Sequence, residues 1–229
     1  MKKVQILDTT IRDGSYAVDF KFSCDDVTEI AARLEKLGLG FIEIGHGQGL
    51  HASSAEHGIS LQSDMEYMDA ARRVLKKSKF GFFCIPGIAR MQDLQTAREH
   101  GVSFIRIGIH AAQFRSAEPY IIKAKKLGFL VMVNFMKSYT VSPAQFAKHA
   151  KAAEELGADY VYIVDSAGCM MPKEIGMYYE EVKQKTNMRI GFHGHNNLGL
   201  AVSNSLYCVQ KGFDLIDCSL QGIGRSLGN

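Results

Sequence analysis

The chain alternates between short apolar runs rich in β-branched and aromatic residues and longer stretches whose apolar positions recur at helical spacing. Read in order, this pattern predicts eight strands separated by seven helices. The strands are expected over 4–7, 41–44, 80–84, 104–109, 130–134, 160–164, 189–193 and 215–218. The helices are expected over 25–37, 64–77, 91–100, 117–127, 143–156, 173–185 and 198–211.

One supersecondary unit recurs along the chain. In each copy a predicted helix ends near a glycine, and a β-rich strand begins a few residues later. Glycine suits the left-handed conformation that closes a helix. The copies lie at 36–44, 100–107, 156–163 and 211–217, and a tighter fifth copy lies at 126–133. Repetition of one unit indicates a repeated architecture.

The predicted fold class is α/β, a closed (β/α)8 TIM barrel. Strands that alternate with helices form a parallel sheet, and eight such units suit a closed barrel. A doubly wound open sheet is the alternative, weakened because no Gly-x-Gly-x-x-Gly loop follows the first strand. We expect residues 1–229 to form a single catalytic domain. A complete barrel covers its eighth strand with another helix, so the sequence predicts a barrel truncated after that strand, without a C-terminal helix or helical region.

Composition narrows the function classes. Of the 229 residues 46% are apolar and 22% charged, as in ordinary globular proteins. A net charge of +3, with no Lys/Arg cluster, argues against a nucleic-acid-binding surface. No apolar run reaches membrane-spanning length, and no signal segment is recognisable. The five cysteines are odd in number, widely spaced and free of Cys-x-x-Cys, which predicts reduced thiols and a cytoplasmic location.

Two histidines carry the strongest chemical signal. His193 and His195 lie in the segment Gly-Phe-His-Gly-His-Asn-Asn, at the end of the seventh predicted strand. Side chains two residues apart on a strand point to the same face, so the pair forms half of a metal site. Two hydrogen-bonded polar side chains without a metal are the alternative, and the pair alone does not separate the two.

The segment after the first strand supplies the missing donor. Barrel active sites lie at the carboxyl ends of the strands, where Asp13 meets His193 and His195 in the predicted fold. Together they would form a two-histidine, one-carboxylate set with open positions, and Asn229 could add an amide oxygen. A 2-oxo acid would chelate such an ion, which stabilises the enolate formed when an adjacent C–C bond breaks. Arg12 would add a fixed positive charge.

Further polar side chains follow other predicted strands at the same rim. We expect four of them to bind substrate: Arg106, Tyr139, Asp165 and Ser166. A structural role is the alternative for each, since barrel interiors carry ion pairs. For Arg106 that alternative is pairing with Glu43.

Several motifs together carry a family resemblance. Leu7-Asp-Thr-Thr-Ile-Arg-Asp-Gly14 and Gly191-Phe-His-Gly-His-Asn-Asn197 resemble the DRE-TIM metallolyase superfamily, the HMG-CoA lyase-like, pyruvate carboxyltransferase-type barrels. Segments 43–50 and 164–168 are most similar to its 4-hydroxy-2-oxovalerate aldolases, and the likeness covers nearly the whole chain.

The resemblance implies a site and a reaction. Asp13, His193 and His195 would be metal ligands, Asn229 would occupy a further ligand position, and Arg12 would stabilise the enolate. The cofactor would be a divalent cation, Mn²⁺ first, with Mg²⁺, Co²⁺ or Zn²⁺ as alternatives. The reaction would be cleavage of a 4-hydroxy-2-oxo acid to pyruvate and an aldehyde. The partner would be a small-molecule 2-oxo acid, with a homo-oligomer as an option.

One departure from the family pattern leaves the general base open. Tyr16 stands where the aldolases carry a histidine. A phenol with an ordinary pKa of about 10 is a poor base near neutrality. The barrel is therefore expected either to take a different substrate or to recruit His46, His110 or Tyr139 as base. Tyr16 and His46 are kept with Arg12 as expected catalytic residues.

Two alternatives for the function follow from the same sequence. One is a Claisen-type acyl-CoA condensing or cleaving enzyme of the superfamily, and the other is a catalytically silent metabolite-binding barrel. The helical region with which the aldolases dock an aldehyde dehydrogenase has no counterpart in this sequence, so that partner is not inferred.

Overall fold

The eight strands form a closed parallel barrel, as the sequence predicts. The computed structural model describes residues 3–226 and 228. Each strand pairs with the next in chain order, and β8 pairs with β1. The strands are β1 (Gln5–Asp8), β2 (Phe41–Ile44), β3 (Lys79–Cys84), β4 (Phe104–His110), β5 (Leu130–Met136), β6 (Tyr160–Asp165), β7 (Arg189–Gly194) and β8 (Leu215–Cys218).

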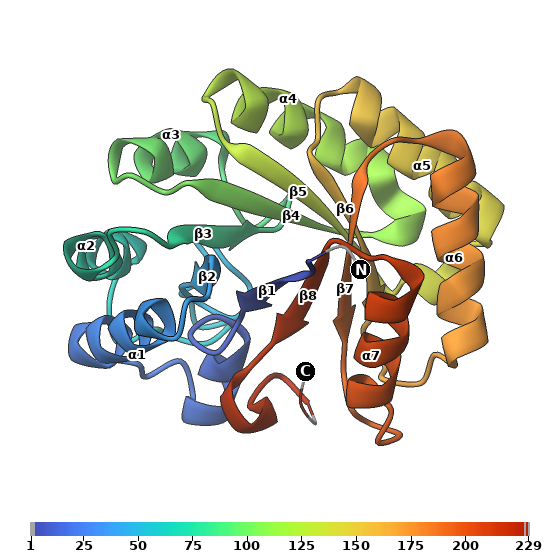
Figure 1. Cartoon of the computed structure of the whole chain (residues 1–229). Coiled ribbons are helices and arrows are strands. Elements are labelled where there is room, and N and C mark those ends of the chain that lie inside the picture. The colour runs from blue at the N-terminus through green and yellow to red at the C-terminus, as the bar shows by residue number, and fades with distance from the viewer. Residues whose placement is uncertain (1–2, 227, 229) are drawn as a thin grey trace.

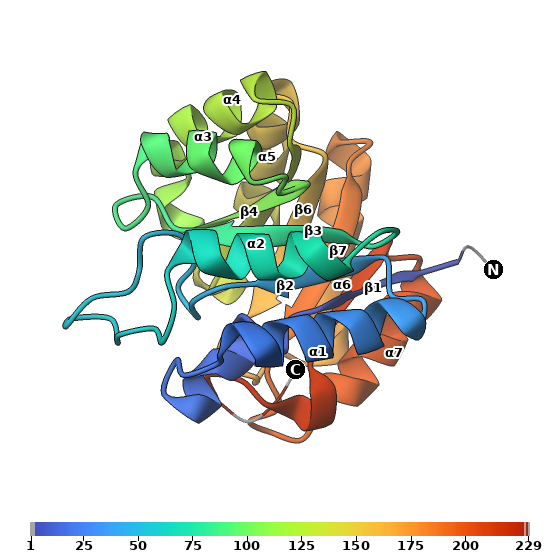
Figure 2. The same ribbon diagram turned by 90° about the vertical axis from the view of Figure 1, so that its left-hand side faces the viewer.

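Seven α-helices lie outside the strands (Figure 1). They are α1 (Cys24–Lys36), α2 (Asp64–Val74), α3 (Met91–Glu99), α4 (Glu118–Lys126), α5 (Pro143–Glu155), α6 (Pro172–Lys185) and α7 (Ala201–Lys211). Short 3-10 turns, η1 (Asp13–Val18), η2 (Ala111–Ala117), η3 (Ser138–Thr140) and η4 (Leu220–Gly222), follow strands β1, β4, β5 and β8. Figure 2 shows α1 and α2 side by side over the barrel, with the loop that precedes α2 extending beyond it.

Two helix boundaries differ from the prediction because side chains bind the backbone there. Helix α2 ends at Val74 rather than residue 77, since Glu35 Oε1 accepts hydrogen bonds from three successive N–H groups at 76–78. Helix α7 begins at Ala201 rather than residue 198, since Asn196 Oδ1 accepts the Ala201 N–H in a preceding turn.

The barrel interior is layered. Its lower part is an apolar cluster of buried side chains that includes Phe41, Phe104, Met132 and Leu215. Because side chains two residues apart share a face, the next positions along these strands also point inward. Those positions are Glu43, Arg106, Asn134 and Asp217, and all four are buried. These four side chains form a polar layer directly below the rim. Beneath it lies the apolar cluster just described, which we call the apolar plug.

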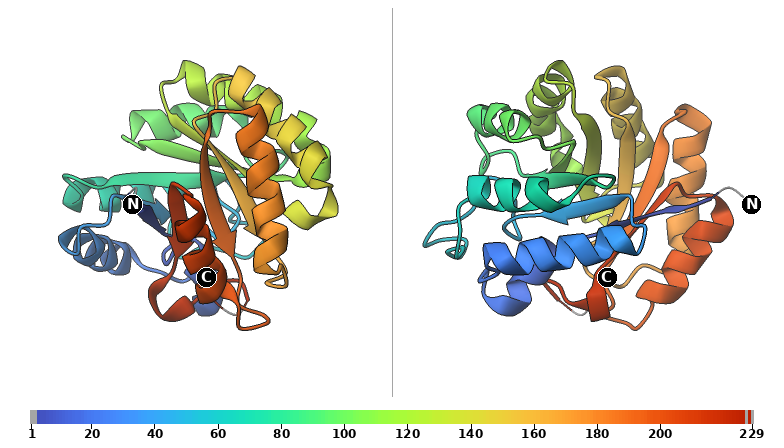
Figure 3. Two further views of the ribbon diagram at one scale, coloured as in Figure 1. Left: turned by 45° about the vertical axis from the view of Figure 1, so that its right-hand side comes forward. Right: turned by 60° about the vertical axis from the view of Figure 1, so that its left-hand side comes forward.

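No α-helix follows β8 among the described residues. An apolar groove of about 540 Å³ lies between α7 and β1, lined in part by Ile6, Val202 and Leu206. Figure 3 shows this side of the barrel, with α7 next to the strand β8. No helix in the described part of the chain is long and apolar enough to cross a membrane. All five cysteines are free thiols.

Candidate metal centre and active-site cavity

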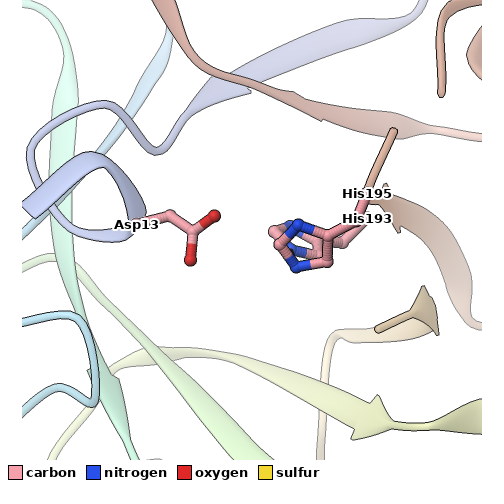
Figure 4. A group of neighbouring side chains, drawn as sticks. All are labelled: Asp13, His193 and His195. Carbon is pink, nitrogen blue, oxygen red and sulfur yellow. Dashed lines mark hydrogen bonds between the residues drawn. The ribbon is translucent and has the colours of Figure 1, made fainter. Parts of the chain in front are cut away.

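Three buried side chains converge at the carboxyl ends of β1 and β7. Asp13 is the first residue of the turn η1 after β1. His193 lies on β7, and His195 is the first residue after that strand. One ligand atom from each lies within 4.8 Å of the others. Figure 4 shows the Asp13 carboxylate facing the two imidazole rings. The sequence prediction that these residues meet at one rim is therefore confirmed by their positions.

Each of the three side chains is in the protonation state that binds a cation. Burial, reinforced by the neighbouring His195, holds the pKa of His193 well below its usual value, and burial lowers the pKa of His195 as well. Burial opposes ionisation of Asp13, but the Arg12 guanidinium, the two neighbouring imidazoles and the Arg225 N–H together outweigh it and keep the pKa of Asp13 below its usual value. Neutral imidazoles and an ionised carboxylate are the forms that divalent metals require.

The hydrogen bonds orient the ring nitrogens toward one point. His193 Nδ1 donates to Asp217 Oδ2 at 2.8 Å, which leaves the lone pair on Nε2. His195 Nδ1 lies 3.1 Å from Ser226 Oγ. The two Nε2 atoms are 3.3 Å apart, within the ~3.0–3.4 Å expected of two nitrogen ligands bonded at ~2.1 Å to one cation. A hydrogen bond between the rings would explain this distance but not the converging Asp13 carboxylate.

A buried chain of charges links this centre to Arg12. Arg12 Nε donates to Glu43 Oε2 at 2.7 Å, and Arg12 Nη1 donates to Asp13 Oδ1 at 2.7 Å. Arg106 bridges the same Glu43 oxygen, at 2.9 Å, to Asp217 Oδ2. Asp217 in turn holds His193. The positions of Asp13, His193 and Arg12 relative to one another are thus fixed by the buried charges below them.

The centre opens into a cavity of about 380 Å³ at the rim. Its polar wall contains Arg12, Asp13, Tyr16, Gln48, His110, Asn134, Lys137, Ser166, His193, His195 and Arg225. Its apolar wall is formed by Phe83, Ile85, Ile88, Met136 and Val164, with Gly47 at one side. This size is typical of small-molecule sites. The mixed wall leaves room for a small acid beside the three converging donors.

Tyr16 lies in this cavity because a glycine faces it. A Cβ at Gly47 would come within 2.2 Å of the Tyr16 ring, so only glycine allows this packing. The Tyr16 ring also meets Phe20 edge-on, with centroids 5.0 Å apart. Burial raises the pKa of the Tyr16 phenol above its ordinary value. The hydroxyl therefore keeps its proton near neutral pH.

The structure does not bring His46 into the cavity, contrary to the expectation of a catalytic role. Its Nδ1 accepts the Gln48 N–H at 3.0 Å, and its Nε2 pairs with the Gly58 carbonyl at 3.2 Å. The ring stacks on Phe20, with centroids 4.0 Å apart. Both nitrogens are occupied by backbone groups, so His46 holds the loop after β2 and is not available as a base.

Of the four expected substrate-binding residues, only Ser166 lines the cavity. Arg106 is completely buried in the charge chain, as in its structural alternative. Asp165 accepts hydrogen bonds from the N–H groups of Cys169 and Met170 and so fixes a loop. Tyr139 lies outside the cavity and is 37% exposed. The fourth expected metal ligand, Asn229, lies outside the described residues.

Sequence reasoning missed Asp217, which orients the candidate metal ligand His193. The available signal was periodicity, because Asp217 is two residues beyond the buried Leu215 and therefore shares its inward face. His110, Lys137 and Arg225 also line the cavity, although the sequence assigned substrate binding to none of them.

Comparison with known proteins now places the chain. Residues 3–229 match the HMGL-like family. The chain belongs to that family.

This HMGL-like chain is 40% identical over 228 residues to a 4-hydroxy-2-oxovalerate aldolase of Carboxydothermus hydrogenoformans, covering 100% of the chain and 68% of the relative. It is 38% identical over 224 residues to an oxaloacetate decarboxylase of Mycobacterium tuberculosis, covering 98% and 66%. The N-terminal domain of a putative aldolase from Bacteroides vulgatus superposes with a TM-score of 0.83 at 28% identity, covering 99% of the chain and 76% of that domain. The HMGL-like barrel thus spans about two thirds of its curated relatives.

Proposed function

We propose that this barrel is a divalent-metal-dependent aldolase that cleaves a 4-hydroxy-2-oxo acid, of the 4-hydroxy-2-oxovalerate type, to pyruvate and an aldehyde. The observation that carries the proposal is the arrangement of Arg12 beside Asp13, His193 and His195 in one cavity. Aldolase relatives at about 40% identity over the whole chain support the reaction class. The five free thiols support a reducing, cytoplasmic location.

Asp13, His193 and His195 would hold the cation, with Mn²⁺ proposed and Mg²⁺, Co²⁺ and Zn²⁺ as the ions to compare. When bound, the cation supplies a Lewis acid for the carboxylate and ketone oxygens of a 2-oxo acid. The donor set of one carboxylate and two imidazoles accepts several divalent metals, so the choice among them is part of the proposal.

Arg12 is proposed to stabilise the enolate. In the cleavage the C3–C4 bond breaks and its electron pair moves into the C2–C3 enolate, while the minor phenolate form of Tyr16 accepts the C4 hydroxyl proton and the aldehyde forms. Arg12 Nε and Nη1 are held by Glu43 and Asp13, and no described residue accepts a hydrogen bond from Nη2. A fixed guanidinium donor next to the developing oxyanion lowers the barrier without reorganisation.

Tyr16 is proposed to transfer the proton in the reaction. Its phenol, which is the predominant form near neutrality, then returns this proton to the enolate carbon of pyruvate. Ser166, whose Oγ accepts the Lys137 N–H at 3.0 Å, is proposed to bind the substrate carboxylate through its hydroxyl hydrogen.

The test is exchange of the pyruvate methyl protons with D2O, followed by NMR with Mn²⁺ present. Exchange needs enolate formation but no knowledge of the aldehyde. We expect exchange in the wild type, loss on chelation, and a loss of 100-fold or more in Arg12→Lys with Mn²⁺ still bound, roughly the effect of removing one oxyanion donor. No exchange by the metal-loaded protein would contradict the proposal and favour the silent-barrel alternative.

Decarboxylation of a 2-oxo diacid is a second candidate, favoured by the lack of a free base in the cavity. Tyr16 keeps its proton, and His110 Nδ1 accepts the Ala112 N–H, so the neutral ring carries its proton on Nε2. Decarboxylation forms the same enolate as CO2 leaves with no proton to remove. A relative named oxaloacetate decarboxylase is 38% identical. Release of CO2 from oxaloacetate above the metal-only rate, without aldol cleavage, would identify this reaction.

A further inference from the structure

The cavity carries more positive charge than the proposed reaction uses. Its lining contains three cations, Arg12, Lys137 and Arg225, and a single carboxylate, Asp13. Arg12 is paired at 2.7 Å with both Glu43 and Asp13. A bound divalent cation would add two further positive charges. The one carboxylate of a simple 2-oxo acid leaves this wall strongly positive.

Lys137 is an unpaired cation in a constrained backbone position. It follows β5 with φ 52° and ψ 52°, the left-handed region, which a residue other than glycine seldom adopts. Its N–H donates to Ser166 Oγ at 3.0 Å, and the next residue, Ser138, bonds Phe135 O at 2.8 Å and accepts the Val164 N–H at 2.8 Å. No described residue pairs with the Lys137 ammonium group. Held backbone strain at a cavity wall is typical of functional positions.

Arg225 lies on the C-terminal segment and lines the same cavity. Its guanidinium carbon is 6.0 Å from the centre of the Tyr16 ring, and no described carboxylate lies within ion-pair distance of it. Arg225 therefore offers its donors beside the residue proposed to protonate the enolate. Lys137 and Arg225 are both exposed, so they belong to the mouth of the cavity rather than to its floor.

The rest of the wall offers a second anion only apolar side chains and weaker polar partners. Five of the lining side chains are apolar, among them Phe83, Ile85 and Met136. Gln48 and Asn134 also line the cavity, but their amide groups carry no charge to pair with an anion. An anionic group away from the converging donors would therefore gain most by contact with Lys137 and Arg225, because charge-assisted hydrogen bonds are about twice as strong as neutral ones.

We propose that Lys137 and Arg225 form an anion subsite, so that the substrate is a 2-oxo acid whose leaving fragment carries a second anionic group, a carboxylate or a phosphate. The inference rests on the proposed function and narrows its substrate class, so that 4-hydroxy-2-oxovalerate, whose leaving fragment is uncharged, is expected to be a poorer substrate than an analogue with a second anionic group. The bonds made and broken are those of the cleavage above, and no further reactant is needed. The two cations bind and orient the leaving fragment, and the reacting carbon stays next to Arg12.

The test compares 2-oxoglutarate with 2-oxopentanoate, which differ only in a distal carboxylate against a methyl group. Binding of each to the Mn²⁺-loaded protein is measured by titration calorimetry. We expect 2-oxoglutarate to bind about tenfold more tightly or better, as for a charged hydrogen bond at a partly exposed site. Added salt should reduce this preference, since exposed charges are screened.

Lys137→Met and Arg225→Met should each reduce the ratio of the two affinities severalfold, and Lys137→Arg should retain most of it. Lys148→Met, an equal charge change on the exposed face of α5, is the matched control and should leave the ratio unchanged. Equal affinities in the wild type, or an unchanged ratio in both Met variants, would overturn the inference.

Activity assays separate the remaining outcomes. Aldol addition of pyruvate to succinic semialdehyde, glyceraldehyde 3-phosphate and butanal distinguishes a carboxylate from a phosphate substrate. Methyl exchange with pyruvate tests the proposed function alone. Exchange without any preference for an anionic partner would leave the proposed function standing and refute the subsite. Absence of exchange, together with no binding of either acid, would refute both.

Discussion

The buried Tyr16 phenol gives the proposed reaction a pH dependence that can be measured. Because burial raises the pKa of its phenol above about 10, the phenolate fraction increases tenfold per pH unit throughout the neutral range. If the phenolate accepts the C4 hydroxyl proton, kcat/KM for aldol cleavage should rise about tenfold per unit from pH 7 to pH 9. Pyruvate release from 4-hydroxy-2-oxovalerate measures this slope. Decarboxylation of oxaloacetate, which removes no proton, should lack it.

Tyr16→Phe is the control for that profile. It keeps the ring that packs on Gly47 and removes only the titrating hydroxyl. The variant should lose the pH dependence along with most aldol activity. A wild-type profile that is flat between pH 7 and 9 would show that Tyr16 is not the base.

Asp8 carries a measurable stability penalty at neutral pH. The side chain is completely buried, and burial raises its pKa from 3.8 to about 6. The native state therefore holds the proton more tightly than the unfolded state, so stability falls as the pH rises from about 4 to about 6. Above that range the charge costs about 3 kcal/mol.

Asp8→Asn should remove this penalty, since an amide oxygen can still accept the Thr10 N–H, now at 2.9 Å. We expect the variant to be up to about 3 kcal/mol more stable than the wild type at pH 7.5, with a smaller gain at pH 4.5. Urea unfolding at both pH values measures the difference. An equal gain at the two values would assign the effect to packing rather than to charge.

Among single residues, the sequence predicted the three candidate metal ligands correctly in position, but it assigned site roles to polar residues that instead hold loops. Asp13, His193 and His195 were predictable because strand periodicity and barrel topology bring them to one rim. His46 and Asp165 are also polar residues at strand ends, but loop N–H and C=O groups occupy them. Which backbone groups a loop turns inward depends on its conformation, and residue type alone does not specify that.

At the level of elements, strands β2, β4, β5 and β8 each carry one member of the polar layer on the inward face. These strands therefore fix Arg106 and Asp217 directly below the candidate metal centre. Asp217 lies within the buried charge chain, between Arg106 and His193, so it fixes both side chains.

Asp217→Asn should weaken Mn²⁺ binding about 10- to 100-fold, as expected for the partner that orients a ligating imidazole. Calorimetric titration with Mn²⁺ measures the change. The matched control is Asp214→Asn at the other end of the strand, where the carboxylate accepts the Ile190 N–H at 2.9 Å. That variant should keep its Mn²⁺ affinity. If both variants lose Mn²⁺ affinity equally, Asp217 contributes only to the stability of the fold and does not specifically orient His193.

The positions of the helices and strands were predicted closely because the apolar residues recur clearly at helical spacing in the helices and at strand spacing in the strands. The predicted strands agree with the structure to within two residues at every end, and most helices agree to within one. The short turns η1 and η2 were missed, since they lack a hydrophobic period and depend on the barrel rim for their shape. Glycine at the end of α7, with φ 96°, supports the repeated helix-glycine-strand unit.

For the molecule as a whole, the proposed centre joins distant parts of the chain. Asp13 follows the first strand, and His193 and His195 come from the seventh, so a bound cation would tie the two together across β8. The apolar plug and the outer helices do not include these side chains. The barrel should therefore fold without the metal and gain stability from it.

Mn²⁺ at 100 times its Kd should stabilise the fold by about 2.7 kcal/mol, which corresponds to a rise in Tm of about 5–10 °C for a domain of this size. EDTA should remove the rise without unfolding the protein at 25 °C. His193→Ala and His195→Ala should each abolish the rise that Mn²⁺ causes, while the metal-free Tm falls only modestly, because both side chains are buried but lie at the end of the barrel rather than in its apolar core. Differential scanning calorimetry measures both quantities. A rise that persists in either variant would place the cation elsewhere, and a collapse of the metal-free Tm would instead give the histidines a structural role.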